Sequence, residues 1–200
     1  MKPKITEENA AAMVMNGIFQ QCDNSWEGMW QILTKMSLKN KTNLPSKDFV
    51  KTNFSLAAIA LNFRIAFDVF PHERAERMLE FTFNLLQRNL GDKNSDTVQK
   101  VILKYFEAYN AGLLEMRNPI TDVAMLLYYK IGMSNTEQKL VDESYYVPDP
   151  KTVEYLANAL AMFAGKWNII QQKFEIVTGS SSGRTKDNEE MVKEDDPGKR

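Results

Sequence analysis

The segment from residue 47 to residue 70 is apolar on nearly every side, and it limits the fold more than any other feature. It reads KDFVKTNFSLAAIALNFRIAFDVF, and its apolar residues leave no broad polar face at helical spacing. A helix with so little polar surface has to be covered by neighbouring helices. We therefore predict an all-α fold, a single bundle built around a buried central helix at about residues 47–70.

Capping residues, glycines and prolines predict helices through the rest of the chain. A capping side chain or an early proline favours a helix start, whereas glycine favours a helix end. The segment CDNS at residues 22–25 is expected to interrupt the first helix, and the spacing of residues 134–137 predicts a brief later helix. No segment alternates convincingly as a strand, so we expect six or seven helices. The expected N-caps are Thr6, Ser25, Ser46, Ser95, Asn118 and Asp149, and the expected helix-ending glycines are Gly91 and Gly132.

The composition changes near residue 178. The chain has 200 residues, 44% of them hydrophobic, and is long enough to bury a core. After residue 177 the sequence reads TGSSSG and then carries mixed charges, with only Met191 and Val192 apolar among them. Such a segment buries too little surface to offset its ordering entropy. We predict one helical domain over residues 1–177 and a flexible, disordered tail over residues 178–200.

The charge balance and the cysteine count exclude several classes of function. The formal net charge is −1, so no global field favours nucleic acid as a partner. A single cysteine, Cys22, excludes an intrachain disulfide and a zinc site built on several thiolates. The N-terminal residues lack the apolar core of a secretory signal, and residues 54–70 are too few and too polar to span a bilayer. We expect a cytoplasmic protein with no transmembrane segment and no nucleic-acid partner.

The only histidine, His72, lies next to a row of glutamates. His72 and Glu76 are four residues apart and share a helix face, but helical metal sites need three or four protein ligands. Glu73, Glu76 and Glu80 form a broad acidic face that suits Mg²⁺, and a magnesium-dependent hydrolase is the weaker alternative function. Acidic residues also favour the start of a helix. On balance we expect no metal site and no cofactor.

Nucleophilic catalysis has few candidate residues in this chain. A dyad would need Cys22 beside His72, and sequence alone does not bring them together. Phosphate-binding glycine loops and the nucleophile-elbow motif are absent from the sequence. We therefore name no catalytic residue and expect a protein that is not an enzyme.

Four polar residues are candidates for ligand binding. Arg64 and Asp68 are four apart on the central helix, where they form a narrow solvent face, a buried ion pair or a ligand contact. Tyr145 and Tyr146 precede a proline-rich turn, where they either pin the loop to the core or form the rim of a pocket. The chain also contains eleven methionines, which fill an ordinary core or line an adaptable cavity. An apolar small molecule is thus the alternative partner.

The C-terminal region has the most regular apolar pattern of the chain. Apolar residues repeat in steps of three and four from Val153 to Val177, which predicts one long helix with a heptad seam. That seam packs either along its own bundle or against a second copy of the chain. Our leading functional hypothesis is a non-enzymatic interaction or regulatory module that binds a protein partner or itself. The residues predicted for self-association are Leu160, Phe163, Trp167 and Phe174.

Overall fold

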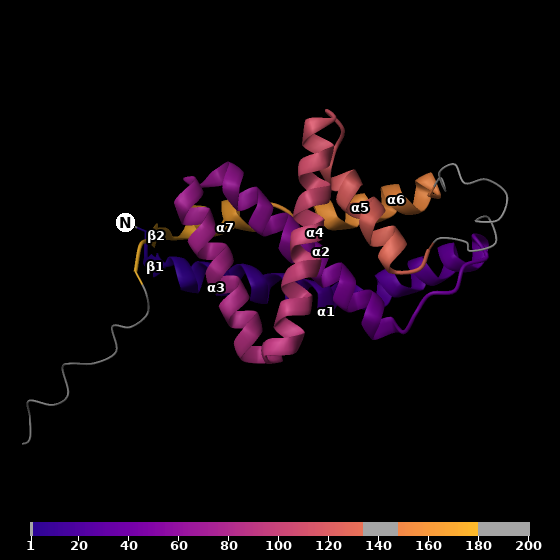
Figure 1. Ribbon diagram of the computed structural model, residues 1–200, viewed down its shortest axis with the longest axis horizontal. Helices are drawn as coiled ribbons and strands as arrows, with labels where there is room; N and C mark the ends of the chain where they lie inside the picture. The colour runs from indigo at the N-terminus through magenta and orange to yellow at the C-terminus, as the bar shows by residue number, and fades with distance from the viewer. Residues whose placement is uncertain (1, 134–147, 180–200) are drawn as a thin grey trace, which may run out of the picture.

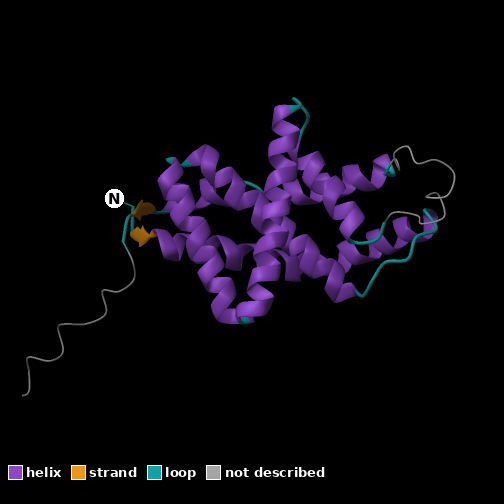
Figure 2. Cartoon of the chain, in the orientation of Figure 1, coloured by secondary structure: helices purple, strands orange, loops and turns teal. Residues whose placement is uncertain are grey.

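The computed structural model describes residues 2–133 and 148–179, apart from the side chains of residues 89, 90, 92 and 93. Helices dominate this part of the chain (Figure 2), which confirms the prediction of an all-α bundle. A short strand lies near each end of the described chain. The elements are β1 (Lys4–Thr6), α1 (Glu7–Lys39), α2 (Lys47–Val69), α3 (His72–Leu90), α4 (Asp92–Leu114), α5 (Pro119–Lys130), α6 (Pro150–Ala161), α7 (Lys166–Lys173) and β2 (Glu175–Val177).

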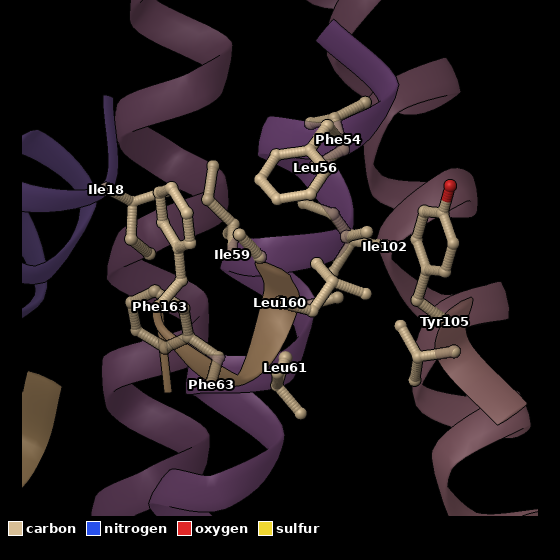
Figure 3. Packing of buried hydrophobic residues seen from close by; sticks show 14 of the residues in the cluster. Ile18, Phe54, Leu56, Ile59, Leu61, Phe63, Ile102, Tyr105, Leu160 and Phe163 are labelled. Carbon is tan, nitrogen blue, oxygen red and sulfur yellow. The ribbon is translucent and has the colours of Figure 1, made fainter. Parts of the chain in front are cut away.

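Helix α2 is the centre of the bundle, as the apolar segment predicts. An unbroken run of its residues from Asn53 to Phe63 is buried. Helix α2 contacts each of the other six described helices. In Figure 3, α2 side chains lie between Ile18 of α1, Ile102 of α4 and Phe163, which follows α6. Because neighbours cover α2 on all sides, it tolerates the missing polar face.

Helix α1 is one continuous helix, so the predicted interruption at residues 22–25 is wrong. It runs along much of the long axis of the molecule (Figure 1). The Ser25 hydroxyl caps no helix here but donates to the Gln21 carbonyl one turn earlier, at 2.7 Å. Cys22 and Trp26 are buried on the same stripe as Ile18 and Leu33. Burial of this stripe against the bundle therefore outweighs the local preference of CDNS for a turn.

The C-terminal region breaks into two helices, so the prediction of one long heptad helix is also wrong. Helix α6 ends at Ala161, and Gly165 adopts a left-handed conformation at φ 78° directly before α7. The buried amide of Asn62 in α2 bridges the break. Its Nδ2 donates to the Phe163 carbonyl at 2.8 Å, and its Oδ1 accepts from the Lys166 amide at 3.3 Å. One polar side chain thus replaces hydrogen bonds that a continuous helix would have made.

The two ends of the described chain pair as parallel strands, which the sequence did not predict. In the ladder of β1 and β2, Lys4 pairs with Glu175 and Thr6 with Val177. The strands lie beside the N-terminus in Figure 1. Each strand has only three residues, too few to reveal the alternation that identifies strands in a sequence.

A buried carboxylate lies where these strands meet the bundle. Glu7 begins α1, and only 1% of its surface is exposed. Arg77 donates to it from Nε at 2.8 Å and from Nη2 at 3.0 Å, and Arg74 donates from Nε at 3.0 Å. The hydrogen bond from Arg77 is the largest cause that lowers the pKa of Glu7. Two arginines of α3 therefore hold α1 to the bundle through one charged group.

Helices α4 and α5 approach each other closely at Gly112. A Cβ atom added there would lie 2.8 Å from the Pro119 Cα and would overlap Oδ2 of Asp122. Asp122 is buried and accepts from Arg117 Nη2 at 2.7 Å. The side chain of Asn118 caps α5 and Pro119 opens it, as predicted. This contact fixes the second half of α4 against α5.

Most predicted helix starts agree with the structure. The side chains of Thr6, Ser46 and Asp149 accept hydrogen bonds from the first turns of α1, α2 and α6. Helix α4 starts at Asp92 instead of Ser95. The brief helix expected near residues 134–137 and the tail from residue 180 lie outside the described residues. Among the described helices, none combines the length and hydropathy that a membrane span requires.

Candidate functional site

The predicted ligand residues Arg64 and Asp68 lie together in one surface pocket. Arg64 Nη1 donates to Asp68 Oδ1 at 3.0 Å, and Arg64 Nε donates to Asn110 Oδ1 at 2.7 Å. The guanidinium carbon lies 5.1 Å from the ring centroid of Tyr109. We call this site the Arg64 pocket; its volume is about 390 Å³, and it is lined by Arg64, Phe67, Asp68, His72, Phe106 and Asn110.

Aromatic rings form the apolar wall of the Arg64 pocket. The rings of Phe67 and Phe106 meet edge to face with their centroids 6.4 Å apart. The centroid of the His72 ring lies 5.2 Å from that of Phe67. The Arg64 side chain is only 16% exposed, whereas that of Asp68 is 51% exposed. The cation is therefore held against α4, while its carboxylate partner faces solvent.

A second and larger pocket opens between α1, α2, α3 and α4. We call it the four-helix pocket; its volume is about 710 Å³. Its apolar floor is made by Met15, Phe19, Leu56, Leu86 and Val98. Polar residues of α1, α2 and α4 line the rest of it: Asp23, Asp48, Lys51, Thr52, Ser55, Asn94 and Thr97.

An ion pair stands at the polar side of the four-helix pocket. Lys51 Nζ of α2 lies 2.5 Å from Asp23 Oδ1 of α1, and both side chains are partly exposed. In the floor, Met15, Leu56 and Leu86 are buried, whereas Phe19 is 39% exposed. The pocket thus combines an apolar interior with a charged mouth, an arrangement typical of small-molecule sites.

Cys22 and His72 have unlike surroundings. Cys22 is fully buried, and burial is the largest cause that raises the pKa of its thiol. The His72 side chain is 74% exposed, and its Nε2 lies 3.0 Å from Glu76 Oε1. A buried thiol with a raised pKa holds little of the thiolate that attacks substrates. This pair therefore offers no nucleophile and base in a common cleft.

The carboxylate row of α3 points outward. Glu73, Glu76 and Glu80 are all exposed. Within residues 2–133 and 148–179, no three His, Cys, Asp or Glu side chains come close enough to hold a metal ion. His72 instead lines the Arg64 pocket, together with Phe67.

The predicted self-association residues lie mainly inside the chain's own core. Leu160 and Trp167 are fully buried and Phe163 is 2% exposed, whereas Phe174 is partly buried. Trp167 packs edge to face on Phe63 and on Phe70, with centroids 5.4 Å apart in both pairs. This favours the first interpretation of the seam, namely packing along its own bundle. Tyr145 and Tyr146 lie outside the described residues.

The four-helix pocket is the feature that sequence reasoning missed. Its lining comes from four helices, between Met15 and Val98. Periodicity identifies which face of each helix is apolar, but not where two apolar faces fail to meet. The high number of methionines, spread over most predicted helices, was the one sequence signal for a cavity. Met15 does lie on the pocket floor.

Comparison with known proteins adds no functional information. No protein-family model, no curated protein and no solved structure matches the chain. The two pockets and their chemistry therefore carry the functional argument.

Proposed function

We propose that the protein is a non-enzymatic binding module that holds an elongated apolar small molecule in the four-helix pocket. The observation that carries this proposal is the apolar floor beneath a charged mouth. The pocket volume of about 710 Å³ lies within the range of roughly 300–1,000 Å³ that is common for small-molecule sites.

The extent of the lining favours a small molecule over a folded partner. Twelve placed residues line the pocket, whereas a stable protein interface uses about 20–30 residues on each side. The lining on α1 runs from Met15 to Asp23, a length of about 12 Å at the rise of an α-helix. Met15 and Phe19 offer a surface that adapts to chains of varied shape.

The mouth of the pocket favours a ligand with one polar end. Lys51, Asp23 and Thr52 all line the pocket, and Lys51 forms an ion pair with Asp23. A polar or charged group placed there stays near water, while the apolar body covers Leu56 and Leu86. Burial of the apolar body contributes about 25 cal/mol for each Å² removed from water.

A fluorescent apolar probe tests the proposal. We expect N-phenyl-1-naphthylamine to bind the purified chain saturably, with one site per chain. Thr52→Trp places an indole over the pocket from an exposed position and should abolish this binding. Asn24→Trp adds the same group at an exposed position of α1 that does not line the pocket, and should leave binding unchanged.

Two results would overturn the proposal. One is the lack of saturable probe binding to the folded chain, with folding checked by circular dichroism. The other is binding that Thr52→Trp leaves intact. A cytoplasmic location remains a prediction of the sequence.

A further inference from the structure

The Arg64 pocket is separate from the four-helix pocket and has a different chemistry. It lies at the end of α2 and the start of α3, against the middle of α4. Its central feature is a rigid cation. Arg64 is held by Asp68 and Asn110 through hydrogen bonds and by Tyr109 through its ring face. Among the residues that the structure describes, these two bonds use two of the five guanidinium N–H groups, so others remain to donate to a ligand.

Asp68 provides the opposite charge at the same point. One of its oxygens accepts from Arg64 at 3.0 Å. In the part of the chain that the structure describes, the second oxygen accepts no hydrogen bond, and the side chain is half exposed. Burial and the nearby Asp68 carboxylate raise the pKa of Tyr109, so its phenol stays neutral. The pocket therefore presents one cation and one anion side by side.

This pairing selects against ligands of a single charge. A purely anionic ligand that approaches Arg64 meets Asp68, and a purely cationic ligand that approaches Asp68 meets Arg64. A neutral apolar ligand would strip water from both charges without replacing it. A ligand that carries both charges on neighbouring atoms pairs with each group in turn.

The aromatic wall adds a requirement for an apolar substituent. Phe67 and Phe106 lie next to the charged pair and line the same pocket. The volume of about 390 Å³ lies near the lower end of the range for ligand sites, which favours a small molecule. The required ligand is thus small, zwitterionic and apolar at one end.

We propose that the Arg64 pocket binds a free α-amino acid with an apolar side chain. The ligand carboxylate accepts from the Arg64 guanidinium, its ammonium group donates to Asp68, and its side chain covers Phe67 and Phe106. Asn110 is a positioning residue, because it holds Arg64 Nε at 2.7 Å.

Calorimetric titration of the full chain tests the assignment without any substitution. We expect L-phenylalanine or L-leucine to bind with one site per chain. Phenethylamine lacks the carboxylate and 3-phenylpropionate lacks the ammonium group, so each should bind at least about tenfold more weakly than L-phenylalanine, since a charge-assisted hydrogen bond is lost. Absence of heat with both amino acids at millimolar concentration would overturn the proposal. Equal binding of either single-charge analogue would also overturn it.

Three variants locate the binding. Asp68→Asn removes the anion at a half-exposed position and should weaken the binding of L-phenylalanine by about tenfold or more. Arg64→Met removes the cation and should weaken this binding further. Glu80→Gln removes a charge from an exposed position of α3 outside the pocket and should leave the affinity unchanged. An unchanged affinity in Asp68→Asn would refute the assignment. Loss of the four-helix pocket by Thr52→Trp should not affect this titration, so the two proposals fail independently.

Discussion

The indole Nε1 of Trp167 donates a hydrogen bond to the main-chain carbonyl of Asn62 at 2.8 Å, joining residues 105 positions apart. The side chain of the same Asn62 bonds to the Phe163 carbonyl and the Lys166 amide. One residue of α2 therefore holds the start of α7 and the break before it. Trp167 is fully buried. We therefore expect a charged substitution such as Trp167→Glu to unfold the chain itself and not merely to dissociate a dimer.

Replacement of Asn62 should destabilise the fold strongly. In Asn62→Ala, the Phe163 carbonyl and the Lys166 amide lose their partner near the core, and we expect a loss of about 3 kcal/mol in the free energy of unfolding. Urea denaturation followed by tryptophan fluorescence measures it. Asn53→Ala is the matched control, because among the described residues Asn53 donates only to the Phe49 carbonyl within α2, and it should cost about 1 kcal/mol or less. Equal losses would show that the Asn62 side chain does not hold the break.

Glu7 should make stability depend on pH in the acid range. Its pKa in the folded chain is below the ordinary value of 4.5. A lowered folded pKa stabilises the fold above the unfolded pKa, and this stabilisation is lost as pH falls through the folded pKa. The free energy of unfolding should therefore decline from about pH 4.5 downward. Denaturation series at several pH values measure this decline.

A variant separates this effect from the titration of other carboxylates. Glu7→Gln leaves two arginines beside a neutral buried group and should lose about 3 kcal/mol at neutral pH, with a shallower decline in acid. Glu27→Gln removes a carboxylate from an exposed pair with Lys47, and should change stability by about 0.5 kcal/mol or less. The same acid decline in Glu7→Gln and the unchanged chain would contradict the prediction.

Two glycines should respond to alanine with opposite signs. Gly112→Ala brings a methyl group against the main chain at Pro119 and against Asp122, so we expect a loss of about 2 kcal/mol from overpacking. Gly17 lies in α1, and beyond the neighbouring backbone of that helix no described atom comes within 4 Å of an added Cβ. Gly17→Ala should gain about 0.5–1 kcal/mol from helix propensity. Thermal unfolding measures both, and a stabilised Gly112→Ala would refute the close approach of α4 and α5.

Two buried tyrosines should also behave differently. The Tyr105 hydroxyl is buried with no hydrogen-bond partner among the described residues, and burial raises its pKa. Tyr105→Phe should therefore gain up to about 1 kcal/mol, because it removes an unpaired polar atom. The Tyr128 hydroxyl accepts from the Asp149 amide at 3.3 Å, so Tyr128→Phe should lose about 1 kcal/mol. A loss in Tyr105→Phe, measured by the same urea titration, would indicate a partner for that hydroxyl.

The sequence predicted the elements that depend on local or averaged properties. The all-round apolar character of α2 identified the centre of the bundle, and the caps at Thr6, Ser46, Asn118 and Asp149 are present. These signals are readable because a cap acts within one turn and burial of a whole helix affects every residue in it.

The errors occurred where distant residues decide the outcome. CDNS stays helical because the face carrying Cys22 and Trp26 is buried. The predicted heptad helix is interrupted before Gly165, because the Asn62 side chain makes hydrogen bonds to the main chain there that a continuous helix would otherwise make. The spacing of Arg64 and Asp68 was readable, but Asn110 and Tyr109 reach them from α4, a contact that spacing does not reveal.

The pairing of Lys4 with Glu175 also has a kinetic meaning. Closing a loop of this length costs entropy that only the prior docking of the helices between the two strands can offset. We therefore expect the ladder to form late in folding and to open early in unfolding. Exchange of its amide hydrogens, compared with that of the helices, would measure this order.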